Sequence, residues 1–280
     1  MNIWQAFIGL ISGSLTTFAD LIAGLGVPQA FGLAIILFTL VIKLVTLPLT
    51  LQQLRASKAM QEMQPELQKL QKKYKGDREK MSQAQMQLYK EAGVNPLGGC
   101  LPMLVQFPVW IALYRALFNL AEQGVLNEGF LWIPSLAEPR DLSWIWPLPT
   151  TPEGWATAAA FLVLPVLTVV SQLIVQQMMT PANPDPQQAS MNQMMKFMPL
   201  MFGFFAMQVP QGLALYWVTS NLFSLIQQYF ITGGGGLNPA SAVAGASDKP
   251  AIDTSTAPVT ETSPDTKRTQ KRGKSSKRKR

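Results

Sequence analysis

A single lysine lies inside an otherwise apolar run near the start of the chain, and this feature constrains the fold most. The run covers residues 30–49 and reads AFGLAIILFTLVIKLVTLPL, with Lys43 as its only charged residue. About 20 apolar residues are enough to cross a bilayer as a helix. A cation in hydrocarbon costs about 2.5–3.5 kcal/mol on insertion scales. We therefore predict that Lys43 faces a polar cavity within a bundle of membrane helices, which is a hypothesis about a functional site.

Further apolar runs follow, so the chain is predicted to be an all-α integral membrane protein. It is 48% hydrophobic and only 14% charged. Lipid offers no hydrogen-bond partner to backbone groups, so apolar spans of this kind form helices. The predicted fold is a five-transmembrane-helix bundle within a core of residues 29–232. The spans are expected at about residues 29–50, 97–121, 156–179, 196–209 and 212–232.

The first 28 residues are predicted to lie on the membrane. The first 42 residues contain no Lys or Arg, which argues against a cleaved signal peptide. Residues 2–24 are apolar but are interrupted by Ser12-Gly13-Ser14 and by Asp20. This pattern favours an amphipathic segment in the membrane interface over an extra span, although both interpretations stay open.

Charge asymmetry predicts the topology. Residues 51–95 carry nine Lys or Arg, whereas residues 122–155 carry one, Arg140, beside five acids. The tail from residue 233 carries ten. Positive loops stay in the cytosol. We therefore expect the N-terminus outside, residues 51–95 and the C-terminus in the cytosol, and residues 122–155 on the far side.

The cytosolic segment 51–95 is predicted to form a helical hairpin. Apolar residues recur there at three- and four-residue spacing on both sides of Gly76-Asp77, which is typical of two amphipathic helices joined by a turn. The hairpin is either a rigid spacer or a mobile paddle that meets substrates. Its methionines would suit adaptable contacts.

Residues 233–280 are predicted to form a disordered basic tail, because their composition cannot build a core. The tail can contact ribosomal RNA, contact anionic lipid, or act only as a topological signal. Its candidate contact residues are Lys267, Arg268, Lys271, Arg272, Lys274, Lys277, Arg278, Lys279 and Arg280.

The predicted spans lack the residues that most membrane chemistry needs. They contain no Asp or Glu, and the whole chain has no histidine and one cysteine. These absences argue against an ion-coupled transporter, a metal site, a bound cofactor and hydrolytic catalysis, so no enzyme is expected. What remains is Lys43 together with neutral polar residues. These either join helices by hydrogen bonds or hydrate a groove, and they include Gln106, Ser171, Gln176 and Asn221.

Several motifs, in order, resemble the YidC family of membrane insertases. Residues 93–102 (GVNPLGGCLP) with 106–110 (QFPVW) are similar to that family's second core span. Residues 47–50 (LPLT) resemble the end of the first span, and 196–199 (KFMP) the fourth. The fifth-span likeness rests on Pro210, Gly212, Leu215-Tyr216-Trp217, Ser220-Asn221 and Gln227-Gln228. Residues 130–136 (FLWIPSL) resemble the chloroplast and cyanobacterial branch.

The resemblance implies a polar groove that opens to the cytosol and to lipid. Lys43 stands where the family usually has arginine, so a positive field is retained while the bidentate fork is lost. The family's groove positions correspond to Gln106, Ser171, Gln176 and Trp217.

The resemblance also implies a protein that inserts, folds and assembles integral membrane proteins in a bacterial plasma membrane or a thylakoid membrane. Expected partners are nascent membrane proteins, the ribosome and membrane lipids; a role for a Sec translocon stays open. The alternative from another class is a small-solute channel or facilitator, and an assembly scaffold is a third.

Overall fold

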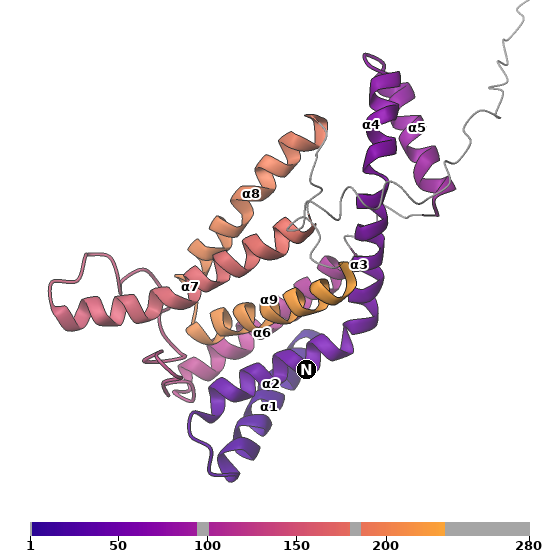
Figure 1. Cartoon of the computed structure of the whole chain (residues 1–280). Helices are drawn as coiled ribbons and strands as arrows, with labels where there is room; N and C mark the ends of the chain where they lie inside the picture. The colour runs from indigo at the N-terminus through magenta and orange to yellow at the C-terminus, as the bar shows by residue number, and fades with distance from the viewer. Residues whose placement is uncertain (1, 94–100, 180–185, 233–280) are drawn as a thin grey trace, which may run out of the picture. The chain divides into compact units, whose positions relative to one another are not determined.

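The computed structural model describes residues 2–93, 101–179 and 186–232 (Figure 1). Regular structure in these ranges is helical, apart from one isolated bridge between Phe130 and Ile133, so the all-α prediction is confirmed for the described part of the chain. The helices are α1 Ile3–Gly24, α2 Ala30–Val45, α3 Leu47–Glu62, α4 Gln64–Lys73, α5 Arg78–Glu91, α6 Leu101–Glu122, α7 Pro152–Met179, α8 Pro186–Ala206 and α9 Gln211–Thr232.

Two of the described helices are long and apolar enough to cross a membrane, and a bent pair makes a third candidate. The two are Ile3–Gly24 and Pro152–Met178; the bent pair is α2 with α3. Length and composition make Ile3–Gly24 a candidate span, whereas the sequence favours placing residues 2–24 in the interface. The interfacial placement and the count of five spans both stay predictions.

The predicted first span is not one straight helix. The α2 and α3 axes differ by 64° at a break around Thr46. Pro48 explains the break, because proline has no N–H for the carbonyl of Leu44 and its ring crowds that carbonyl. The Thr46 N–H instead bonds the carbonyls of Ile42 and Leu44. Lys43 therefore lies in the last turn of α2.

The α4 and α5 helices pack side by side and are joined by a tight turn (Figure 1). Gly76 in this turn has a φ of 100°, a conformation that glycine adopts without steric cost. Asp77 caps α5 by accepting the N–H of Lys80, and this bond lowers the pKa of the Asp77 carboxyl.

The main core lies between α1, α2, α6, α7, α9 and the connecting segment of residues 123–151. Its fully buried large side chains are aliphatic, and Leu213 of α9 is one of them. Burying such a side chain stabilises the fold by about 1.5–3 kcal/mol. The largest of them are Leu15, Ile35, Leu113, Leu117, Leu126, Leu136, Leu164 and Leu213.

The 123–151 segment is folded against the helix ends. The N–H groups of Gln211 and Gly212, which begin α9, bond the carbonyls of Glu138 and Leu136 at 3.1 and 3.0 Å. The Trp144 indole donates to the carbonyl of Met207 at 3.1 Å, and the Arg140 guanidinium donates to that of Ala121 at 3.1 Å. These bonds satisfy backbone groups at the ends of α6, α8 and α9 that helices leave unpaired.

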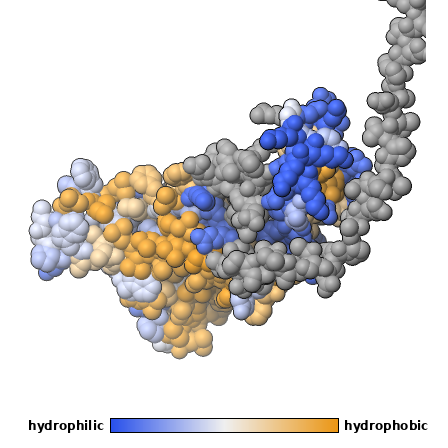
Figure 2. Space-filling model, turned by 45° about the horizontal axis from the view of Figure 1, so that its top comes forward, coloured by the Kyte–Doolittle hydropathy of each residue, from blue (hydrophilic) through white to orange (hydrophobic). Residues whose placement is uncertain are grey.

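Large apolar side chains remain exposed on the helices that bury the core. They are frequent on α7, α8 and α9, for example Val166, Phe204 and Phe230. Figure 2 shows hydrophobic residues over a broad area of one face, with hydrophilic residues gathered apart from them. Exposed apolar surface of this extent marks contact with lipid or protein and not with water.

A close approach between α2 and the 123–151 segment gives a stability prediction. A Cβ on Gly32 would overlap the ring of Phe130. Gly32→Ala should destabilise the protein by about 1–3 kcal/mol, the usual cost of overpacking a core. The measurement is thermal unfolding of the purified chain in detergent.

Gly9 provides the matched control, because a Cβ at this position in α1 meets nothing within 4 Å. Gly9→Ala should be neutral or stabilise by up to about 1 kcal/mol through helix propensity. Phe130→Leu in the Gly32→Ala background should recover part of the loss. Equal melting temperatures for the two glycine variants would show that the ring moves aside at no cost.

Candidate functional site

Three of the six predicted groove residues are hydrogen-bonded to or from one helix, α9. Four residues of α9 form what we name the polar row: the partners Tyr216, Asn221 and Ser224, together with Ser220, whose carbonyl accepts the Ser224 hydroxyl. At 100° per residue these positions fall within one side of the helix, and the eight steps from Tyr216 to Ser224 rise about 12 Å. A cation from α2 and neutral polar groups from α6 and α7 therefore converge on a single helical face.

Lys43 meets the polar row at Ser224. Its Nζ donates to the Ser224 Oγ at 2.9 Å, and that hydroxyl donates onward to the carbonyl of Ser220 at 2.9 Å. No ion pair to Lys43 occurs among the residues that the structure describes, so its charge is not neutralised by a carboxylate there. Its place in the last turn of α2 puts the ammonium at the negative end of the helix dipole, which favours a cation.

Gln106 of α6 meets the polar row at Tyr216. The Gln106 amide donates to the Tyr216 hydroxyl. The tyrosine is 2% exposed, and a buried phenol normally needs a partner of this kind. The contact joins α6 to α9 two turns away from the Lys43 contact.

Ser171 of α7 meets the polar row at Asn221. The Asn221 amide donates to the Ser171 Oγ at 3.0 Å, and that hydroxyl donates to the carbonyl of Thr168 at 3.1 Å. Gln176 lies five residues further along α7 and is half-buried. The structure thus brings Ser171 of α7 and Asn221 of α9 together, and it places Gln176 further along α7.

Trp217 lies beside the polar row but is packed among aromatic rings. It is 8% exposed, stacks on Trp110 with ring centroids 6.0 Å apart, and meets Phe202 edge-on at 5.7 Å. Its position therefore joins α9 to α6 and α8. Its predicted role in a groove stays a prediction.

Sequence reasoning missed two members of the polar row. Tyr216 entered only as part of a family motif, and Ser224 was not singled out. A signal for Ser224 existed: it follows Tyr216 and Ser220 at four-residue intervals, so the three lie on one helical face. The partner of Lys43 on another helix, however, cannot be read from spacing along one segment.

The remaining sequence-predicted residues lie elsewhere. The basic tail residues, from Lys267 to Arg280, are outside the described part of the chain. Among the residues that are described, no group of three or more His, Cys, Asp or Glu is placed to hold a metal ion.

Known proteins with similar sequences are membrane proteins. The family described as 60Kd inner membrane protein matches residues 24–235. The chloroplastic inner membrane protein PPF-1 of Pisum sativum is 44% identical over 238 residues, which cover 81% of this chain and 54% of that protein. The membrane protein insertase YidC of Syntrophobacter fumaroxidans is 43% identical over 204 residues, covering 72% of this chain and 34% of that protein.

A shorter bacterial relative is matched over most of its length. The membrane protein insertase YidC of Fusobacterium nucleatum is 40% identical over 205 residues, which cover 73% of this chain and 87% of that protein. In contrast, the chain spans about half the length of the chloroplast relatives that it matches.

The contact between Ser171 and Asn221 gives a prediction about coupling. In a double-mutant cycle with Ser171→Ala and Asn221→Ala, the interaction energy should be about 0.6 kcal/mol, the average for hydrogen bonds between membrane helices. The measurement is the free energy of unfolding of the four proteins in one detergent.

The control cycle pairs Ser171→Ala with Ser14→Ala. The Ser14 hydroxyl bonds the carbonyl of Leu10 within α1, so the two changes should add without coupling. Additive losses for Ser171→Ala and Asn221→Ala as well would remove the inferred link between α7 and α9.

Proposed function

The chain belongs to the 60Kd inner membrane protein family, and from this premise we propose that it is a membrane protein insertase. It receives hydrophobic segments of newly made proteins and passes them into the lipid. The names of the Syntrophobacter and Fusobacterium relatives support this activity, and they give no support to a small-solute channel.

The observation that carries the proposal is the polar row with its cation. Lys43 lies half-buried in an apolar helix, next to Ser224, and has no carboxylate partner among the described residues. An ionised side chain without a carboxylate partner inside an apolar helix costs free energy, and such residues mark functional sites. In the proposed function, this side of α9 lines a groove that hydrates the polar flank of an arriving segment.

The proposed mechanism needs no covalent step. Lys43 attracts acidic or polar flanks of the substrate, and the neutral groups of the polar row exchange hydrogen bonds with them. The apolar part of the substrate then moves along exposed side chains of α7, α8 and α9 into lipid. Burial of that surface in the bilayer supplies about 25 cal/mol per Å².

The proposed topology has five spans. They are formed by α2, by α6, by α7, by the end of α8 within residues 196–209, and by α9, with α1 in the interface. Pro108, Pro165 and Pro199 lie inside α6, α7 and α8, as membrane helices tolerate. The positive charge of residues 51–95 supports a cytosolic place for α4 and α5, and hence an outer place for the 123–151 segment.

The proposed partners follow from this arrangement. Nascent membrane proteins are the substrates. The cytosolic α4 and α5 helices, together with the basic tail, would contact the ribosome or anionic lipid. A Sec translocon is a further candidate partner. The proposed location is a bacterial plasma membrane or a thylakoid membrane.

Topology is the first prediction to test. In a Cys100→Ser background, a cysteine that replaces Lys75 should react with an impermeant thiol reagent only from the cytosolic side. One that replaces Pro139 should react only from the opposite side, because the positive-inside rule separates the two segments. Labelling of both from the same side would rule out this arrangement.

The charge of Lys43 gives the functional prediction. Lys43→Arg should preserve insertion. Lys43→Glu should slow insertion of substrates with acidic translocated tails about tenfold more than that of neutral-tailed substrates, since like charges repel in a poorly hydrated groove. Lys43→Leu should fall between them. The measurement is insertion into liposomes of matched substrates that differ only in tail charge.

Ser224→Ala is the matched control, because it removes the hydrogen-bond partner of Lys43 while leaving the charge. It should lower insertion of both substrates by a similar, small factor. Equal effects of Lys43→Glu across the substrate series would remove the electrostatic role of Lys43. Such a result would leave the insertase proposal standing, whereas no insertion by the unmodified chain would refute it.

A further inference from the structure

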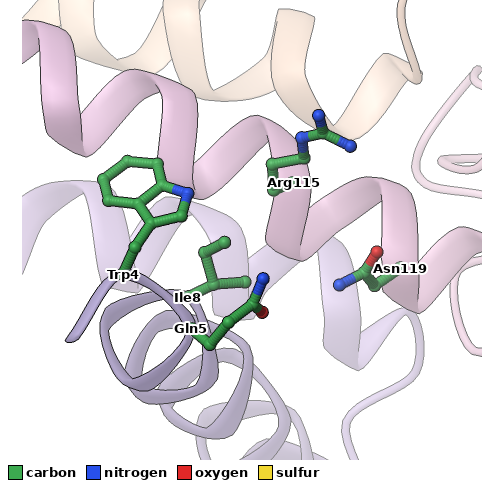
Figure 3. Close-up of a pocket in the computed structure, with 5 residues that line it drawn as sticks. All are labelled: Trp4, Gln5, Ile8, Arg115 and Asn119. Atoms are coloured by element: carbon green, nitrogen blue, oxygen red, sulfur yellow. The ribbon is translucent and has the colours of Figure 1, made fainter. Parts of the chain in front are cut away.

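A pocket of about 290 Å³ lies between the start of α1 and the second half of α6 (Figure 3). It is apart from the polar row of α9. Trp4, Gln5 and Ile8 line it from α1, and Arg115 and Asn119 line it from α6. In Figure 3 the amides of Gln5 and Asn119 face each other, Trp4 lies to one side, and the Arg115 side chain extends from α6 above the two amides.

The charge of the pocket is positive and unbalanced. Arg115 is exposed, and within the described residues no hydrogen bond or ion pair engages its guanidinium. No Asp or Glu is among the residues that line the pocket, and the first turn of α1 contains no acidic residue. The N-terminal end of a helix carries a partial positive charge, so α1 adds to the same field.

The donors in the pocket suit an oxyanion. A guanidinium can hold two oxygens of a phosphate through parallel N–H bonds. The amides of Gln5 and Asn119 can each donate to a further oxygen or bond a hydroxyl group. Trp4 supplies an apolar wall with an indole N–H at its edge. Tryptophan is enriched at the headgroup level of membranes.

The position of Arg115 along α6 suits contact with lipid headgroups. Arg115 lies seven residues before the end of α6 at Glu122, about 10 Å along the axis. With the membrane placement proposed above, this is the depth from which an arginine reaches the headgroups.

We propose that this pocket binds the phosphate headgroup of an anionic phospholipid, beside the indole of Trp4. The ligand ties α1 to α6 from the lipid side. The proposal depends on the membrane placement of α6 and not on insertase activity.

The test uses native mass spectrometry of the full chain taken from mixed micelles. Phosphatidylglycerol and phosphatidylcholine are present in equal amounts. The unmodified protein should retain phosphatidylglycerol about tenfold over phosphatidylcholine, the ratio expected of one charge-assisted hydrogen-bonded contact. Arg115→Gln should bring the ratio close to one. Arg55→Gln is the control, because it removes the same charge from an exposed position on α3 and should keep the preference.

Fluorescence locates the lipid without changing Arg115. Phosphatidylglycerol with brominated acyl chains should quench Trp4 more than brominated phosphatidylcholine does, and Trp4→Phe should abolish this difference. Equal loss of preference in Arg115→Gln and Arg55→Gln would overturn the proposal. So would equal retention of the two lipids by the unmodified chain, or an absence of lipid preference combined with binding of inorganic phosphate. None of these readouts measures insertion, so the lipid site and the proposed function can fail separately.

Discussion

A polar side chain inside a membrane helix needs a partner on another helix, and in this chain α9 supplies it. Lys43, Gln106 and Ser171 belong to three different helices, and each forms a hydrogen bond with the polar row of α9. The arrangement of α2, α6 and α7 around α9 depends on these contacts together with aliphatic packing. A helix without such a row would remove these partners from the half-buried Lys43 and Gln106, and a buried polar group left unsatisfied costs about 1–3 kcal/mol.

The two ends of α9 are held differently. Its first residues donate backbone hydrogen bonds to carbonyls of the 123–151 segment and pack around Leu213, which is fully buried. Further along α9, single side-chain bonds such as that from Lys43 to Ser224 link it to its neighbours. Backbone bonds in a packed core persist, whereas isolated polar contacts exchange readily with water or other polar groups. The same helix therefore carries both persistent backbone bonds and side-chain bonds that can exchange.

Much of this organisation could be predicted from the sequence, because apolar length and polar interruption are local properties. The all-α class follows from the apolar runs, and family membership follows from motifs such as residues 106–110; the match to residues 24–235 confirms it. The 64° break at Thr46 was missed, although Pro48 was visible, because a proline alone does not say whether a membrane helix kinks or ends. The pairing of Lys43 with Ser224 was also missed, since it joins positions 181 residues apart.

The weakness of the contacts to the polar row is what suits them to the proposed function. A hydrogen bond between membrane helices contributes about 0.6 kcal/mol on average, close to the thermal energy RT. Polar groups of an arriving segment can therefore replace Asn221 or Ser224 as partners without unfolding the bundle. A carboxylate paired with Lys43 would have prevented this, because breaking a buried ion pair costs about 3–5 kcal/mol. A lysine whose hydrogen-bond partner among the described residues is a serine hydroxyl keeps its charge available to each new segment, while the aliphatic core and the backbone bonds at the start of α9 maintain the fold.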